Sequence, residues 1–279
     1  MLPDVLPPSL RQDENGLWIS KARSKIAYPE GGLSHFRDVE QDSFWFRHRN
    51  RCIAAAVSRH PPDGAIVDVG AGTGFVASGL QAEGYQVIVV EPHIDGALVA
   101  RRGGLEHVVC ASFEDVGFAS SSIAAIGLFD VLEHIEDEVA ALARFSQVLK
   151  PEGRLYITVP SYQFLFSSED LVVNHFRRYT VGSCARVLAS AGFETEYHSY
   201  LFTLLLPPIF VLRALPYRLG RRQAADIESV AAAHGIAGIT GRAIDAVLDL
   251  EARWIARGGR LAFGSSCFAG RAKSAIIVD

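Results

Sequence analysis

The sequence predicts an α/β fold with a doubly wound, mostly parallel sheet of seven strands and a helical insertion before the last strand. Two observations lead to this fold class. Short apolar runs alternate with segments of helical periodicity between residues 65 and 200, which is typical of parallel strands joined by helices. A glycine-rich turn at residues 70–74 follows the first apolar run, where a strand would pass directly into a helix. With 279 residues, 49% of them hydrophobic, the chain can bury a substantial core.

Each expected element follows from its local pattern. Residues 43–59 are amphipathic and precede a Pro-Pro-Asp-Gly turn, so they are expected to form a helix before the first strand. Apolar runs predict strands at 65–69, 86–90, 107–110, 124–129, 154–159, 193–200 and 266–272. Helical periodicity predicts the intervening helices at 75–83, 95–102, 136–149 and 181–191. Right-handed crossovers in such a sheet place ligands at the carboxyl ends of the strands.

The chain is expected to divide into three parts. Residues 1–42 are rich in proline and glycine and predict an irregular N-terminal arm. Residues 43–200 and 265–279 form the expected α/β core. Between them, residues 201–264 lose the alternation and read as helical, and about 60 residues is longer than an ordinary connection. This insertion is therefore expected to be a cap or an interaction element.

One apolar stretch, residues 200–219, is almost as long and as apolar as a membrane-spanning helix. Pro207 and Pro208 break it and Arg213 interrupts it, so it falls short of the roughly 20 apolar residues of a spanning helix. A buried or substrate-lining helix is the favoured interpretation. Peripheral membrane contact through residues 201–219 is the alternative.

Composition restricts the partners and the location. The formal net charge of −4 argues against broad nucleic-acid binding, and a homodimer is left open. The four cysteines (Cys52, Cys110, Cys184 and Cys267) are far apart in the sequence and form no CxxC pair. They are expected to be small apolar residues in a reducing compartment, and the N-terminus has no signal-peptide pattern, so a cytoplasmic location is predicted.

The turn after the first strand indicates a nucleotide-like ligand. Gly70, Gly72 and Gly74 allow positive φ and close approach of a ligand, and the helix that follows offers free N–H groups. The spacing is GxGxG, whereas the dinucleotide fingerprint is GxGxxG, which disfavours a dehydrogenase. Asp68 lies two residues before the first glycine.

Several motifs in this order resemble class I S-adenosylmethionine-dependent methyltransferases. They are Asp68 with the GxGxG turn, Glu91 at the end of the second strand, the D-V-L-E-H pattern at 130–134 and the Lys-Pro-Glu-Gly turn at 150–153. The resemblance covers roughly residues 44–200 and the last strand. It implies the Rossmann-like fold of that family and S-adenosyl-L-methionine as cofactor.

The resemblance also implies a set of cofactor-binding residues. They are Asp68, Gly70, Ala71, Gly72, Gly74, Phe75, Glu91, Pro92, Ser112, Phe113, Phe129, Asp130 and Arg49. Glu91 is expected to accept hydrogen bonds from both ribose hydroxyls. Ser112 stands where the family has an aspartate for the adenine amino group, and Phe113 could pack on the adenine; simple loop packing is the alternative for both. Arg49 could hold the cofactor carboxylate, or belong to a solvated basic helix face.

Three residues are candidates for catalysis: His134, His175 and Asp130. A histidine is suited to remove a proton from the acceptor. The alternatives are a backbone-bonded helix start for His134 and a helix-capping segment for the Asn174–Thr180 stretch around His175, which resembles an acceptor-side loop of related enzymes. Asp130, Glu133 and His134 lie on one face of a helical turn, as in relatives that bind a divalent ion, yet the prediction is that no metal is needed.

The predicted function is methyl transfer to a small-molecule acceptor, with oxygen favoured over nitrogen or carbon and an apolar or lipid-linked acceptor favoured by residues 201–215. Two alternatives remain open: a non-methylating binder of the cofactor, and an enzyme that uses the cofactor itself as substrate. An RNA methyltransferase is disfavoured by the acidity of the chain and the lack of a basic domain.

Overall fold

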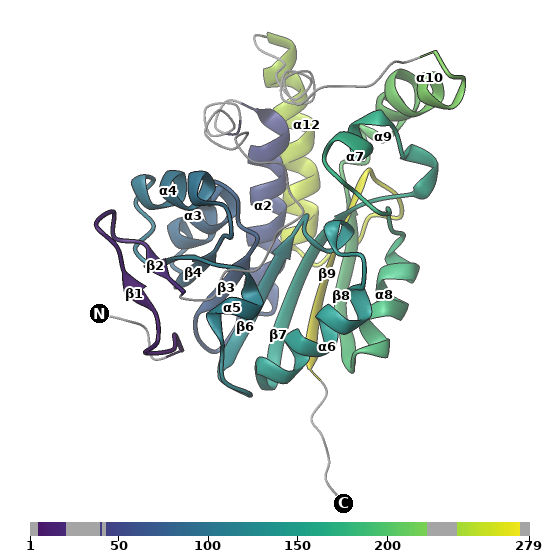
Figure 1. Cartoon of the computed structure of the whole chain (residues 1–279). Helices are drawn as coiled ribbons and strands as arrows, with labels where there is room; N and C mark the ends of the chain where they lie inside the picture. The colour runs from purple at the N-terminus through teal and green to yellow at the C-terminus, as the bar shows by residue number, and fades with distance from the viewer. Residues whose placement is uncertain (1–4, 21–39, 41–42, 222–238, 274–279) are drawn as a thin grey trace, which may run out of the picture.

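A computed structural model describes residues 5–20, 40, 43–221 and 239–273, and shows one twisted sheet with helices on both faces (Figure 1). The strand order is β1-β2-β5-β4-β3-β6-β7-β9-β8. The strands are β1 (Arg11–Gln12), β2 (Trp18–Ile19), β3 (Ile66–Val69), β4 (Val87–Val90), β5 (Val108–Cys110), β6 (Ile123–Phe129), β7 (Leu149–Pro160), β8 (Phe193–Leu201) and β9 (Ser266–Lys273). The pairs from β2 through β7 are parallel, and β9 is antiparallel to both β7 and β8. The predicted doubly wound α/β fold is thus confirmed.

The helices follow the predicted alternation. They are α2 (Phe44–Arg59), α3 (Phe75–Ala82), α4 (Ile94–Arg102), α5 (Phe113–Val116), α6 (Glu138–Val148), α7 (Ser168–Val172), α8 (Val181–Ser190), α9 (Leu206–Ile209), α10 (Leu215–Arg218) and α12 (Ile239–Ala256), with 3-10 turns η2 (Leu132–His134) and η3 (Gln163–Leu165) and a π-helical turn η4 (Phe210–Ala214). A side-chain oxygen of the preceding residue caps several helix starts: Ser43 accepts from the Trp45 N–H, and Thr180 accepts from the Ser183 N–H.

The core divides between the two faces of the sheet because successive strand residues point to opposite sides. In β4, Ile88 and Val90 belong to the core cluster that includes buried residues of α5, α6 and α8, whereas Val87 and Val89 belong to the cluster with buried residues of α2, α3, α4 and α12. All four β4 residues are buried. Strands buried on both faces read as continuous apolar runs, which is why they were recognisable in the sequence.

The sheet has nine strands in the described residues, two more than expected. The additional pair is the β1–β2 hairpin, which falls in the arm that was expected to be irregular. Asp13 forms the turn by accepting from the N–H groups of Asn15 and Leu17, and Leu17 is fully buried. The hairpin then adds to the sheet through parallel pairing of β2 with β5.

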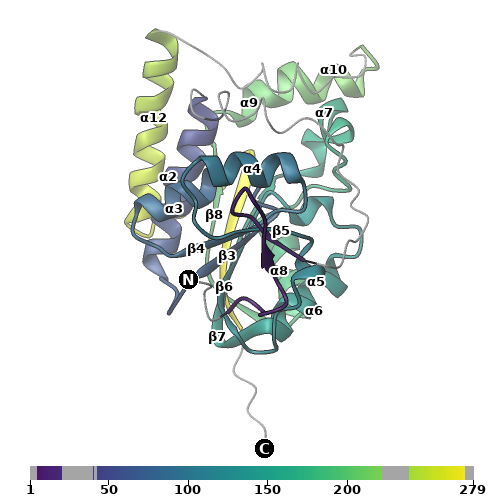
Figure 2. The same cartoon turned by 60° about the vertical axis from the view of Figure 1, so that its left-hand side comes forward.

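The segment between β8 and β9 contributes two separate helical elements. Helix α12 runs beside α2, and α9, η4 and α10 form a helical segment across the end of the molecule where α7 also lies (Figure 2). In α12, Leu248 and Ile255 are buried against the core, whereas Trp254 is exposed. Residues 222–238 of the expected insertion lie outside the described residues.

Among the described residues, no helix has both the length and the apolarity that crossing a membrane requires. The four cysteines are all free thiols, as expected; Cys52, Cys184 and Cys267 are buried and Cys110 is half-buried.

Candidate active site

A pocket lies at the carboxyl ends of the parallel strands, where the fold predicts a ligand. It is bounded by the turn after β3, the ends of β6 and β7, helix α2, the segment from α7 to residue 178, and Ile209 and Arg213 of α9 and η4. Its lining residues are Glu40, Trp45, Phe46, Arg49, Gly70, Ala71, Gly72, Thr73, Phe129, Asp130, Glu133, His134, Pro160, Glu169, Asp170, Val173, His175, Arg178, Ile209, Arg213, Ser265 and Ser266.

The glycines of the turn have different surroundings. Gly72 has a φ of +56°, and a Cβ at this position would meet no atom within 4 Å, so it would project into open space beside the pocket. Gly74 has a φ of +74°, and a Cβ there would collide with Leu105 and approach Ala100 to 2.9 Å. Gly72 thus leaves room for a ligand against the backbone, whereas Gly74 allows α3 to pack closely.

Two buried carboxyl groups lie close to this turn in the sequence or the structure, and Glu91 binds it directly. Glu91, at the end of β4, accepts from the Gly72 N–H at 2.7 Å and the His93 N–H at 2.8 Å. Burial raises its pKa to about 7, against the opposing effect of these two hydrogen bonds. Burial also raises the pKa of Asp68 to about 8, although Arg49 opposes the shift.

Helix α2 delivers Arg49 to the pocket. Its guanidinium pairs with Asp130 and lies over the rings of Trp45 and Phe46, 5.0 and 5.3 Å from their centroids. Asp130 also accepts from the Thr158 hydroxyl at 2.9 Å and has a φ of +58°. The side chain of Arg49 is only 9% exposed, so the alternative of a solvated basic face is wrong for this residue.

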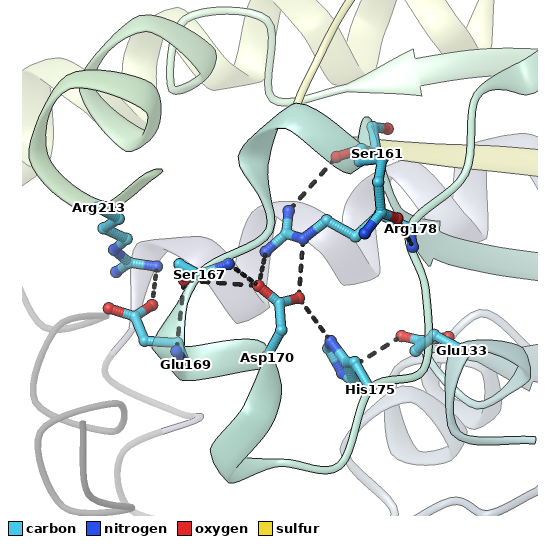
Figure 3. Close-up of polar contacts among 9 residues, drawn as sticks. Glu133, Ser161, Ser167, Glu169, Asp170, His175, Arg178 and Arg213 are labelled. Atoms are coloured by element: carbon cyan, nitrogen blue, oxygen red, sulfur yellow. Dashed lines mark hydrogen bonds and ion pairs between the residues drawn. The ribbon is translucent and has the colours of Figure 1, made fainter. Parts of the chain in front are cut away.

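Asp170 organises the opposite wall of the pocket (Figure 3). It accepts from His175 Nδ1 at 2.8 Å and from two nitrogens of Arg178 at 2.8 and 3.0 Å. Burial alone would raise the pKa of Asp170, but the hydrogen bonds from His175 and Arg178 outweigh burial and lower it to about 2. An ionised carboxylate only accepts hydrogen bonds, so His175 Nδ1 donates to Asp170, and Nε2 is the ring nitrogen that remains for another partner.

Glu133 and His134 complete this wall. Glu133 is fully buried, and neither carboxylate oxygen has a hydrogen-bond partner among the described residues; its Oε1 lies 3.9 Å from His175 Nε2. Burial, and then the nearby Asp130, raises the pKa of Glu133. Burial, followed by the charge of His175, lowers the pKa of His134 to about 4, so its ring is neutral at neutral pH.

The arrangement at this wall also meets a geometric condition for metal binding. One ligand atom from each of Glu133, His134 and His175 lies within 4.8 Å of the others. Asp130, the third member of the helical-turn set, instead binds Arg49 and Thr158. The prediction that no metal is needed is not tested by this geometry and stays a prediction.

Eight of the expected site residues line the pocket together: Arg49, Gly70, Ala71, Gly72, Phe129, Asp130, His134 and His175. The others lie outside its lining: Asp68, Gly74, Phe75, Glu91, Pro92, Ser112 and Phe113. Ser112 caps α5 by accepting from the Asp115 N–H, and the Phe113 ring packs in the core 4.6 Å from that of Phe145. These contacts match the loop-packing alternative, while the adenine roles of both residues stay predictions.

Sequence reasoning missed several pocket residues. Asp170 and Arg178 are the most informative of them, because they fix the orientation of His175. A signal for Asp170 was present: Ser167 and Asp170 form a capping box at the start of α7, and the Asp170 carboxylate accepts from the Ser167 N–H at 2.8 Å. Nothing in the sequence pattern indicated Glu40, whose carboxylate accepts from the Thr73 hydroxyl.

A doubly wound sheet with a glycine turn over buried acids, open at its carboxyl edge, defines a class of cofactor-dependent proteins. Residues 37–198, more than half of the chain, match a family described as "Methyltransferase domain". The chain therefore belongs to this methyltransferase family, and it is of the S-adenosylmethionine-dependent class I type that its motifs resemble. The family and the names of its relatives support S-adenosylmethionine as the cofactor.

Curated relatives match part of the chain. One, from Mycobacterium tuberculosis, is named "Probable S-adenosylmethionine-dependent methyltransferase MT3114" and is 23% identical over 56% of this chain and 58% of its own length. The match thus spans little more than half of that relative. A ubiquinone biosynthesis O-methyltransferase of Xanthomonas oryzae is 30% identical over 33% of this chain and 41% of its own length.

A solved S-adenosylmethionine-dependent methyltransferase of Thermotoga maritima shares the fold, with a TM-score of 0.52 and 17% identity over 86% of this chain and 94% of its own.

Proposed function

We propose that the protein transfers a methyl group from S-adenosylmethionine to a hydroxyl oxygen of an apolar small molecule. The observation that carries the proposal is the His175–Asp170 pair, because Asp170 binds Nδ1 of a histidine that lines the pocket beside the glycine turn and leaves its Nε2 for the acceptor. The partial match to ubiquinone biosynthesis O-methyltransferases supports oxygen as the acceptor atom.

The cofactor fits the residues present. The open space over Gly72 and the backbone turn from Gly70 would hold it, with Glu91 below the turn. Arg49 and Asp130 border the pocket between this turn and His175. When bound, S-adenosylmethionine supplies a methyl group on a positively charged sulfur, which needs no further activation.

The residues of the chain then position the acceptor and take up its proton. His175 Nε2 would accept the proton of the acceptor hydroxyl during transfer of the methyl group that bound S-adenosylmethionine would supply. Asp170 holds the ring in the required tautomer and stabilises the imidazolium. Trp45, Phe46 and Ile209 give part of the pocket an apolar wall for the body of the acceptor.

His175→Gln tests the base directly. We expect kcat to fall by about 10²–10⁴-fold with phenols that carry an apolar chain, because general-base catalysis contributes that much. S-adenosylhomocysteine release is followed by mass spectrometry, and its affinity by calorimetry should stay unchanged. His107→Gln, outside the pocket lining, is the control and should keep the wild-type rate.

Asp170→Asn separates the positioning of His175 from cofactor binding, since it should lower kcat without changing the affinity for S-adenosylhomocysteine. Full activity of His175→Gln on every phenol that the wild type methylates would refute the base assignment. Activity should also survive EDTA; loss on chelation, restored by Mg²⁺, would overturn the prediction that no metal is needed.

A further inference from the structure

The helical segment formed by α9, η4 and α10 carries an exposed apolar stripe. Val211, Leu212, Leu215 and Leu219 are 53%, 67%, 37% and 56% exposed. Leu212, Leu215 and Leu219 follow at i, i+3 and i+7, so they share one face of the helix. Leu204, just before the segment, is 48% exposed as well. The exposed apolar side chains thus cluster between Val211 and Leu219 and are more than a scattered surface leucine.

All charged residues of this helical segment are positive. Between residues 200 and 222 the sequence contains four arginines (Arg213, Arg218, Arg221 and Arg222) and no acidic residue, although the whole chain has a net charge of −4. Arg213 is used within the protein, since it pairs with Glu169 at 2.8 Å. Arg218 and Arg221 are exposed at the end of the apolar stripe. An apolar helix face bordered by arginines is the pattern of a helix that lies on an anionic lipid surface.

A shallow apolar hollow lies beside the stripe. Phe164, Leu206, Pro207, Phe210 and Val211 line it, and the one charged residue in its lining is Arg218. The ring of Phe164 meets that of Phe210 at 5.8 Å, so η3 and η4 form the two sides. This pairing of an apolar hollow with a cationic rim fits an acyl chain below an anionic headgroup.

The same helical segment borders the active-site pocket. Ile209 and Arg213 line that pocket, while the stripe one turn further on is exposed. In Figure 2 the segment runs along the upper end of the molecule, on the side where α7 lies and away from α6. A surface bound by this segment would therefore lie next to the pocket.

We infer that residues 204–221 dock the protein onto an anionic membrane surface and place the pocket beside the bilayer. Binding to lipid goes beyond the proposed methyl transfer and does not depend on it. A second copy of the chain is the less favourable occupant, because a two-fold contact through this face would bring the arginines of both copies together. Electrostatic attraction to anionic lipid, in contrast, uses them.

Vesicle flotation tests the inference with the full-length protein. We expect the wild type to float with phosphatidylcholine vesicles that contain about 30% phosphatidylglycerol, and to float at least about tenfold less with pure phosphatidylcholine. Raising NaCl from about 0.1 M to about 0.5 M should release much of the bound protein, because salt screens the arginines.

Two double variants separate the apolar contribution of the leucines from the electrostatic contribution of the arginines. Leu212→Glu/Leu215→Glu should lower the bound fraction at least about tenfold, and Arg218→Ser/Arg221→Ser should remove the preference for the anionic vesicles. The matched control is Val139→Glu/Ala143→Glu, which places the same charges on exposed positions of α6 and should bind as the wild type does. Unchanged affinity for S-adenosylhomocysteine verifies that each variant is folded.

Three results would overturn the inference. The first is a wild type that does not float with anionic vesicles, and the second is a leucine pair variant that floats like the wild type. The third is a wild-type dimer in light scattering that the leucine pair variant converts to a monomer, since the stripe would then be a dimer interface. None of these results depends on the acceptor, so they leave the test of methyl transfer separate.

Discussion

Gly72 and Gly74 lie two residues apart in one turn, yet they are glycines for different reasons. Both have positive φ, so any side chain is strained at either position. The space around them differs: nothing lies within 4 Å of a Cβ at Gly72, whereas Leu105 and Ala100 would collide with one at Gly74. Gly72 thus leaves space for a ligand beside the backbone, whereas Gly74 allows α3 to pack closely against Leu105 and Ala100.

Substituting the two glycines separates these roles. Gly72→Val should abolish binding of S-adenosylhomocysteine in calorimetry while the protein still unfolds cooperatively in urea. Gly74→Val should cost about 1–3 kcal/mol more in free energy of unfolding than Gly72→Val, because it overpacks the contact of α3 with Leu105. Wild-type affinity in Gly72→Val would show that the turn is not the cofactor site.

At the scale of elements, α2 connects the pocket to the C-terminal helix. Arg49 of α2 faces Asp130 in the pocket, while His48 faces away and contacts Glu251 of α12 at 3.0 Å. Glu251 also accepts from the N–H groups of Phe202 and Thr203, at 2.5 and 3.1 Å. One nearly buried carboxylate therefore joins α12, α2 and the end of β8.

Glu251→Ala is expected to lower the free energy of unfolding by about 3 kcal/mol, because it leaves a buried imidazole and two N–H groups without an acceptor. Asp249→Ala is the control: Asp249 pairs with Arg51 nearer the surface, and its loss should cost no more than about 1 kcal/mol. Urea denaturation measures both. Equal costs would mean that the buried network adds nothing beyond a surface ion pair.

At the scale of the whole molecule, the free energy of unfolding should depend on pH, because the buried carboxyl groups of Asp68 and Glu91 stay protonated in the folded chain. The raised pKa values of Asp68 and Glu91, about 8 and about 7, mean that the folded chain keeps protons which the unfolded chain releases above its ordinary values near 4. This contribution to stability is complete below those ordinary values and is lost as pH rises to about 8.

The ligand-free protein should accordingly lose stability between about pH 5 and 7, by about 1.4 kcal/mol per pH unit for each such proton, and more slowly from pH 7 to 8 as Glu91 and then Asp68 ionise in the folded chain. Asp68→Asn should flatten the dependence, whereas Asp63→Asn, at an exposed position, should leave it unchanged. Thermal unfolding at several pH values measures the slope. A melting temperature that rises across this range in the wild type would contradict the assignment.

The sequence predicted the parallel core closely because its strands are buried on both faces and its helices have a clear period. The helix expected at 75–83 is Phe75–Ala82, and the strand expected at 86–90 is Val87–Val90. The β1–β2 hairpin escaped prediction, since strands of two residues have no readable alternation.

The site was predicted less completely than the fold, for a physical reason. Residues adjacent to a motif, such as Gly72 and Asp130, could be identified from local spacing. Asp170 and Arg178 acquire their roles only through contact with His175 in the folded chain. Arg49 was an expected residue, but its burial and its pairing with Asp130 depend on the packing of α2 over the pocket, which the sequence alone does not give.

The hairpin that extends the sheet also limits how the protein can polymerise. An open strand edge presents unpaired N–H and C=O groups that can recruit a second molecule, as in fibril growth. Pairing with β2 covers the edge of β5, and the outermost strand, β1, is only two residues long and includes Arg11. At the other edge, β8 interrupts its apolar residues with Glu194 and Glu196. Both margins of a sheet rich in valine and isoleucine are thus poor templates for growth.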